Sequence, residues 1–262
     1  MSLTFTANAQ GLSSNIPAVA SMTNGWAKGQ IKVDAINALT SGTTMALHQI
    51  DQDGAGTNVK WQAQMLKSDA THHQIKMTGA GSVISSASVL SSALPANGSL
   101  VNFFFGWTNL TQYMQLTDPL GNVITDGTNS FLVANSANNG PLSTTGGANG
   151  EVTINAQSGA SRASTWYGFA IYSTGTIPAA ATAPRYSVPS PSDANIVGFW
   201  RLNDATSGTT PTSASASVGN PLVLSGTYNW SGVGTNQWVY IGAPPIQPKV
   251  ASFGARHRSF YY

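Results

Sequence analysis

The chain has 262 residues, enough for one large β domain or two small domains with a real core. Only 8% of its residues are Asp, Glu, Lys or Arg, against a usual share of about 25%, and the formal net charge is +2. This composition argues against a coiled coil, and the lack of Lys/Arg runs argues against a nucleic-acid partner. Cysteine is absent, which excludes disulfides, thiolate nucleophiles and Cys-ligated metals.

The first residues of the sequence do not suggest a targeting signal. Residues 1–6 have neither a basic segment nor an apolar core, so we expect no signal peptide. No stretch approaches the roughly 20 apolar residues that span a bilayer, so we also expect no membrane partner.

Apolar residues recur with a period of two along most of the chain, which is typical of half-buried strands. Residues 26–36 place Ile31, Val33 and Ala35 on one face. Residues 59–65 place Val59, Trp61, Ala63 and Met65 on one face, which we expect to point into the core. Further strands are predicted at 100–107, 113–117, 151–156, 165–172, 196–202, 221–224 and 237–241. Gly, Asn and Ser clusters separate them, so the pattern predicts an all-β, antiparallel β-sandwich of the jelly-roll type.

Composition also suggests how the chain is organised. Residues 1–176 form the predicted main sandwich, and the Pro-, Ala- and Ser-rich residues 177–193 form a connector. Residues 194–242 supply strands that complete the sandwich, or form a small second β unit. Residues 243–262 hold three prolines and are predicted to form an extended C-terminal arm.

A more specific pattern lies in the last third of the chain. Three segments follow one another here: the run from Ile196 to Asp204, the Ser-Gly-Thr-Thr turn at 207–210 and the Gly-Asn-x-Leu-x-Leu segment at 219–224. Together they resemble the opening of a concanavalin A-like, laminin-G type jelly roll. Residues 3–6, 26–35, 99–125 and 166–172 are similar to later elements of that family, so the order looks circularly permuted. Together with the charge-poor composition, the resemblance implies a structural protein of a tailed-phage virion.

Carboxylates are too few for the common hydrolytic sites. Glu151 is the only glutamate, whereas glycosidases use a pair of carboxylates flanking the bond that breaks. The Glu-x-Asp-x-x-Glu strand of the glucanase branch of the family is missing. We therefore predict that the chain is not an enzyme.

Residues 51–58 (Asp-Gln-Asp-Gly-Ala-Gly-Thr-Asn) have the oxygen donors and glycines of a calcium loop. The candidate ligands for Ca²⁺ are Asp51, Asp53 and Asn58. The position of the bidentate glutamate is taken by Gln62, so we favour a simple hairpin turn and no bound cofactor. His72 and His73 point to opposite faces of any strand and, with His48 and His257, are interpreted as solvated loop histidines.

Two features suggest binding surfaces. Trp230 lies between Asn229 and Ser231 in a turn-like stretch and is the best candidate for an exposed ring that stacks on a sugar. The arm ends in a basic and aromatic group that we expect to bind a partner subunit: Arg256, Arg258, Phe260, Tyr261 and Tyr262.

The sequence thus predicts a non-enzymatic virion protein, assembled in the host cytoplasm. Its main interpretation is a capsid decoration or head-fibre subunit that forms homo-oligomers and binds other virion and capsid proteins. One alternative is a lectin-like module of a tail or surface-adhesion apparatus that binds a host-surface glycan. Another alternative is a jelly-roll major capsid protein. The number of copies per virion would distinguish it from a decoration protein.

Overall fold

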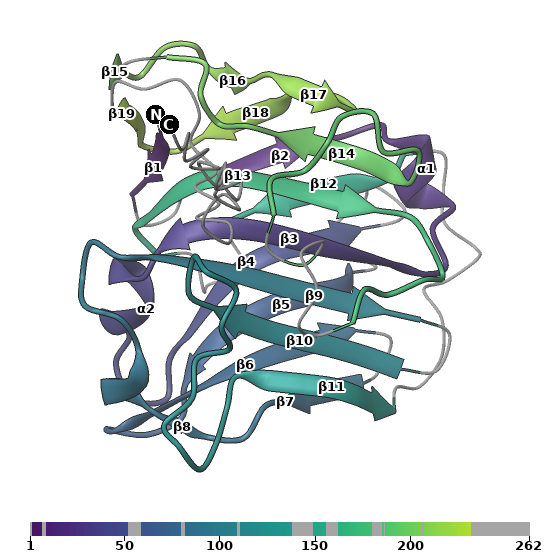
Figure 1. The fold of residues 1–262 in the computed structure, drawn as a ribbon. Coiled ribbons are helices and arrows are strands. Elements are labelled where there is room, and N and C mark those ends of the chain that lie inside the picture. The colour runs from purple at the N-terminus through teal and green to yellow at the C-terminus, as the bar shows by residue number, and fades with distance from the viewer. Residues whose placement is uncertain are drawn as a thin grey trace, which may run out of the picture.

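The computed structural model describes residues 2–6, 9–51, 59–79, 82–108, 111–137, 149–155, 162–179, 185, 187–205 and 207–231. Two antiparallel sheets pack face to face in this part of the chain (Figure 1). The predicted all-β antiparallel sandwich is therefore confirmed. The helices described are single turns, α1 (Pro17–Ala20), α2 (Asp34–Asn37) and the 3₁₀ turn η1 (Ser91–Ala93). No described helix is long and apolar enough to cross a bilayer.

The strands form two layers, which we call sheet A and sheet B. Sheet A has the spatial order β11 (Leu132–Ala137), β10 (Thr111–Thr117), β9 (Leu100–Trp107), β3 (Gly25–Lys32), β13 (Ser164–Tyr172), β1 (Ser2–Phe5), β19 (Tyr228–Ser231) and β15 (Ser207–Gly208), with β14 (Ile196–Trp200) beside β13 and β17 (Ala216–Val218) beside β14. Sheet B has the order β16 (Ser213–Ala214), β18 (Leu222–Ser225), β2 (Gln10–Ser13), β12 (Glu151–Ile154), β4 (Thr44–Asp51), β5 (Val59–Lys67), β6 (His72–Gly79) and β7 (Ser82–Ser85), with β8 (Val89–Leu90) also on β6.

Strands from the two ends of the described chain are neighbours in both layers. In sheet A, β1 lies between β13 and β19, with Leu3 opposite Trp166 on one side and Trp230 on the other. In sheet B, β2 lies between β12 and β18. The segments that carry the family-like pattern, β14 and β18, each pair with one nearby strand and one distant strand: β14 with β17 and β13, and β18 with β16 and β2.

The core lies between the sheets and follows the predicted alternation. Trp61, Ala63 and Met65 on β5 are all buried, which confirms the register expected for these three residues, and the side chain of Val59 lies outside the described part of the strand. Trp61 stacks on Trp107 of the opposite sheet with ring centroids 5.5 Å apart and planes 17° apart. The two layers are thus joined by direct aromatic contact.

The predicted strand at residues 26–36 is wrong at its end. Strand β3 stops at Lys32, and α2 follows at once. Val33 and Ile36 are both fully buried, and a spacing of three residues places them on one side of a helical turn. The Asp34 carboxylate accepts a hydrogen bond from the Gly98 amide at 2.8 Å, which ties this turn to the loop before β9.

Candidate functional site

A second apolar cluster lies on the outer face of sheet A, away from the core between the layers. Strand alternation turns Ala27, Gly29 and Ile31 inward and Trp26 and Lys28 outward. The cluster is formed by Trp26, Phe104, Ala170, Tyr172, Ile196 and Phe199, with Tyr113, Ile177 and Val218 against it. Outward-facing side chains of a sandwich are usually solvated, so something must cover these.

The described residues of the connector (177–179, 185 and 187–193) lie over this face, and Arg185 binds them to the sheet. The Arg185 guanidinium lies 4.2 Å from the ring centroid of Phe104 and donates from Nη1 to Gln115 Oε1 at 2.9 Å. Its Nε donates to the Pro178 carbonyl at 2.6 Å within the connector. Burial lowers the pKa of Arg185 to about 10, which still leaves it charged at neutral pH.

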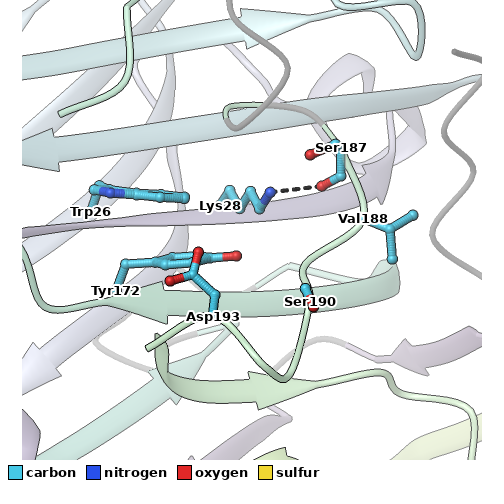
Figure 2. A pocket seen from close by; sticks show the side chains of 7 residues that line it. All are labelled: Trp26, Lys28, Tyr172, Ser187, Val188, Ser190 and Asp193. Atoms are coloured by element: carbon cyan, nitrogen blue, oxygen red, sulfur yellow. Dashed lines mark hydrogen bonds between the residues drawn. The ribbon is translucent and has the colours of Figure 1, made fainter. Parts of the chain in front are cut away.

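A pocket of about 160 Å³ opens where the connector meets the sheet. Figure 2 shows its lining residues, of which three come from strands β3 and β13 and four from the connector: Trp26, Lys28, Tyr172, Ser187, Val188, Ser190 and Asp193. The Trp26 and Tyr172 rings stack with centroids 3.6 Å apart and planes 11° apart. The Lys28 ammonium nitrogen lies 5.6 Å and 5.7 Å from the two ring centroids.

The charges in this pocket are strongly perturbed by burial. Lys28 is 1% exposed and donates from Nζ to the Ser187 carbonyl at 2.7 Å. Burial lowers its pKa to about 7, and the nearby Asp193 carboxylate opposes that shift. Burial, helped by the same carboxylate, raises the pKa of Tyr172 above its usual range. Near neutral pH the charged and neutral forms of the amine are therefore close in free energy.

The pocket offers both donors and acceptors to a ligand. The Trp26 indole N–H is buried without a hydrogen-bond partner, although the ring lines the pocket. Asp193 is exposed at the rim, where its carboxylate accepts from the Asn195 amide at 2.9 Å. A rigid aromatic wall with a few convergent polar groups is the usual make-up of a small-molecule site. Hydroxyl groups are suited to its rim because they can donate to the Asp193 carboxylate.

The sequence did not indicate this site, although one signal was present. An aromatic residue, Trp26, and a lysine two positions later share the face opposite the apolar residues of β3. The periodicity predicts only that this face is not the core, and it gives no hint that the connector packs on it.

The prediction that Trp230 is exposed is wrong. The residue lies on β19 and is 0% exposed, and its indole N–H donates to the Pro211 carbonyl at 3.0 Å. Its neighbour in the sheet is Leu3, so pairing with the N-terminal strand turns this side chain into the core. No ring face is left on which a sugar can stack.

The candidate calcium ligands are only partly placed. Asp51 ends β4, is 3% exposed and lies opposite Glu151 of β12. Asp53 and Asn58 lie outside the described residues, as do the arm residues Arg256, Arg258, Phe260, Tyr261 and Tyr262 and the strand predicted at 237–241. Within the described part of the chain, no group of three His, Asp or Glu side chains is placed to hold a metal.

The interpretation of the histidines as solvated loop residues is wrong for two of them. His48 lies in the core on β4, with its ring 5.1 Å from that of Phe169. His73 on β6 is buried, and its two ring nitrogens contact the Ile36 carbonyl and the Ser91 hydroxyl. Of the three described histidines only His72, the first residue of β6, is partly exposed, and its Nδ1 pairs with Asp69 at 3.0 Å. His257 lies outside the described residues.

Comparisons with known proteins give structural neighbours but no family. No protein-family description matches the sequence, and no curated protein does. A heptameric SAP-like pentraxin from Limulus polyphemus is similar in structure with a TM-score of 0.47 and 9% identity, covering 85% of this chain and 93% of its own. The enzymatically active domain of tailspike protein 2 from bacteriophage CBA120 has a TM-score of 0.46 and 11% identity, covering 77% of this chain and 34% of its own. An alginate lyase from Klebsiella pneumoniae has a TM-score of 0.35 and 12% identity, covering 58% of this chain and 61% of its own. Likenesses this distant assign neither an activity nor a ligand to the chain.

Proposed function

We propose that this chain is a non-enzymatic structural subunit of a phage virion, of the capsid decoration or head-fibre type. The observation that carries the proposal is the scarcity of charge: 11 basic and 9 acidic residues among 262. Two of these side chains, Lys28 and Arg185, are buried on the outer face of sheet A and leave the surface poorer still. The centres of protein interfaces are depleted of charged residues, because burying an ion costs desolvation energy.

In this proposal the C-terminal arm anchors the subunit to its neighbours. We expect the three prolines of residues 243–262 to disfavour a helix, which would lower the entropy lost on docking, and the terminal aromatic residues to provide anchors. The test is deletion of residues 249–262 in the phage that encodes the chain. We expect the truncated protein to keep its circular dichroism spectrum and melting temperature but to be missing from purified virions by mass spectrometry. Incorporation at the full-length level would refute the arm, and absence of the full-length chain from virions would refute the structural role.

The pocket on sheet A favours a second candidate function, a lectin-like module that binds glycans. Its volume of about 160 Å³ admits only a small part of a ligand, such as one sugar unit at the end of a glycan. In this reading the sugar contacts the aromatic lining residues Trp26 and Tyr172, and one of its hydroxyl groups donates to the Asp193 carboxylate. This function is compatible with the first, since a virion subunit can also bind a glycan.

A glycan array followed by titration calorimetry tests this second function. The variant Asp193→Asn removes the rim charge but preserves the turn, because an asparagine oxygen can accept the same amide hydrogen bond. The matched control is Asp118→Asn, a partly exposed aspartate whose carboxylate also accepts from backbone amides of a turn and which does not line the pocket. We expect the pocket variant to weaken binding at least tenfold and the control to leave it unchanged. Equal affinity of the two variants, or no glycan bound at millimolar concentration, would contradict the proposal.

A further inference from the structure

A lysine, a serine and a histidine form a continuous chain of hydrogen bonds at one end of sheet B. The Lys67 ammonium group donates to Ser91 Oγ at 3.2 Å, and Ser91 Oγ lies 2.9 Å from His73 Nδ1. On the other side of the ring, His73 Nε2 lies 3.1 Å from the Ile36 carbonyl oxygen. These residues do not line the pocket on sheet A, and neither of the functions proposed above uses them.

Strand pairing brings the three side chains together. Lys67 is the last residue of β5 and lies directly opposite His73 of β6. Strand β8 also pairs with β6, with Val89 opposite His73. Ser91 follows β8 at once as the first residue of η1, and its amide donates to the Thr71 carbonyl at 2.7 Å. Backbone hydrogen bonds thus fix the position of each member of the group.

The Ile36 carbonyl decides which nitrogen of the His73 ring carries the proton. A carbonyl oxygen only accepts hydrogen bonds, so the neutral ring donates from Nε2 and keeps its lone pair on Nδ1. The Ser91 hydroxyl therefore donates to Nδ1 while its oxygen accepts from the Lys67 ammonium group. Burial, helped by the Lys67 charge, lowers the pKa of His73 to about 4, so the neutral ring is the main form at neutral pH. The ring can then take up the hydroxyl proton.

This arrangement is the one that makes a serine nucleophilic. A reactive hydroxyl lies within hydrogen-bond reach of a base, and a third group orients that base. Here Ser91 is the hydroxyl, His73 is the base and the Ile36 carbonyl is the orienting group. Lys67 adds a positive charge beside the oxygen, where it stabilises the negative charge that develops during an attack on a carbonyl group.

The surroundings of Ser91 leave the hydroxyl within reach of a small reagent. Ser91 is partly exposed, and its neighbours Leu90 and Ser92 are exposed. His73 is 1% exposed, so the base is shielded from water behind the serine. A buried base and a partly exposed nucleophile favour a small substrate over a bulky one.

We propose that Ser91 is a nucleophile that takes the acyl group of a small carboxylic ester. Its oxygen forms a bond to the carbonyl carbon, the ester C–O bond breaks, and the acyl group stays on the serine. The hydroxyl proton passes to His73 Nδ1 and from there to the leaving alkoxide, which departs as the alcohol. The proposal is independent of the structural role given above, because a single acylation of the chain requires no turnover.

Acetylation of the full-length chain by 4-nitrophenyl acetate tests the proposal. Peptide mass spectrometry after chymotryptic digestion measures the rate at which each serine gains an acetyl group. A positioned base accelerates such a step by about 10²–10⁴-fold, so we expect Ser91 to react at least roughly tenfold faster than its exposed neighbour Ser92. Ser91→Ala should remove this product. The matched control Ser92→Ala should leave the rate at Ser91 unchanged.

Two further variants distinguish a nucleophile from a serine that only satisfies the buried ring. His73→Gln keeps an amide that can accept from Ser91 and donate to Ile36 but cannot take up the proton, so acetylation of Ser91 should slow at least roughly tenfold while the circular dichroism spectrum is unchanged. Lys67→Met removes the charge at a partly exposed position and should slow the reaction at least roughly threefold, which keeps the test decisive if the His73 variant does not fold. Equal rates at Ser91 and Ser92, no acetyl-Ser91 at millimolar ester, or either variant reacting as the parent does would overturn the proposal.

Discussion

Replacement of Trp61 by alanine tests the packing of the two layers most directly. The side chain is 1% exposed on β5, and its ring stacks on Trp107 of sheet A. Removing it deletes a large apolar volume at a contact between the sheets, where neighbouring strands are held by their own hydrogen bonds and cannot close the gap. Large-to-small changes of this kind cost about 3–5 kcal/mol in the free energy of unfolding.

The indole nitrogen gives a second, more discriminating variant. Neither Trp61 nor Trp107 has a hydrogen-bond partner for its buried N–H. Trp61→Phe keeps an aromatic contact and removes an unpaired donor, whose burial costs about 1–3 kcal/mol. We therefore expect this change to cost under about 2 kcal/mol, well below the alanine variant.

Urea unfolding, followed by tryptophan fluorescence and far-ultraviolet circular dichroism, measures the change in the free energy of unfolding for each variant. The two values can be compared if the variants keep the parent dependence of that free energy on urea concentration. The exposed change Val223→Ala serves as the control and should alter stability by less than about 0.5 kcal/mol. A loss below about 1 kcal/mol for Trp61→Ala would refute the register of β5 and the contact between the sheets.

Three further predictions concern buried groups. Burial in the core lowers the pKa of His48 from 6.5 to about 3, so the unfolded chain binds a proton that the folded chain does not, and this group should lower the free energy of unfolding by about 2 kcal/mol from pH 7 to pH 5. Burial also lowers the pKa of His73 to about 4, which lowers stability over the same pH range. In urea titrations, His48→Phe should therefore remove about half of the total loss and leave the part due to His73. Burial lowers the pKa of Lys28 from 10.5 to about 7, so between pH 7 and pH 9 the folded chain has already lost a proton that the unfolded chain still binds, and the free energy of unfolding should rise by about 2 kcal/mol. Above pH 10 stability should decline, because the pKa of Tyr172 is raised and only the unfolded chain then loses the phenol proton. A flat stability profile from pH 7 to pH 11 would contradict both assignments. Gly29→Ala should lower the melting temperature by several degrees, because a Cβ at this position would lie 2.2 Å from the Phe103 ring. An unchanged melting temperature would show that the ring can move away without cost.

Local sequence patterns were sufficient for the fold class and for one strand register. Alternating apolar residues at 59–65 identified Trp61, Ala63 and Met65 as core residues because a strand turns successive side chains to opposite faces. The same rule failed after Lys32, where Val33 and Ile36 meet the core through a helical turn. Alternation over a few residues cannot distinguish a strand that continues from one that ends.

The candidate site shows what local patterns leave open. Periodicity places Trp26 and Lys28 on one face of β3, but it does not say what lies over that face. The Ser187 carbonyl that binds Lys28 and the stacking partner Tyr172 come from more than 140 residues further along the chain. Such contacts depend on long-range chain closure, which leaves no mark on the sequence near Trp26.

The fate of Trp230 has the same physical cause. Its neighbours Asn229 and Ser231 are polar, so the sequence alone suggested an exposed ring, whereas pairing of β19 with β1 turns the ring into the core. The sequence by itself determined that the chain folds into strands, that its surface is poor in charge and that cysteine chemistry is excluded. Which strands become neighbours was decided only in the tertiary structure, because backbone hydrogen bonds between strands are alike and the burial of whole faces selects the pairing. This pairing of strands buried Trp230, the residue predicted to bind a sugar. It also formed the pocket between the connector and sheet A, which the sequence did not predict.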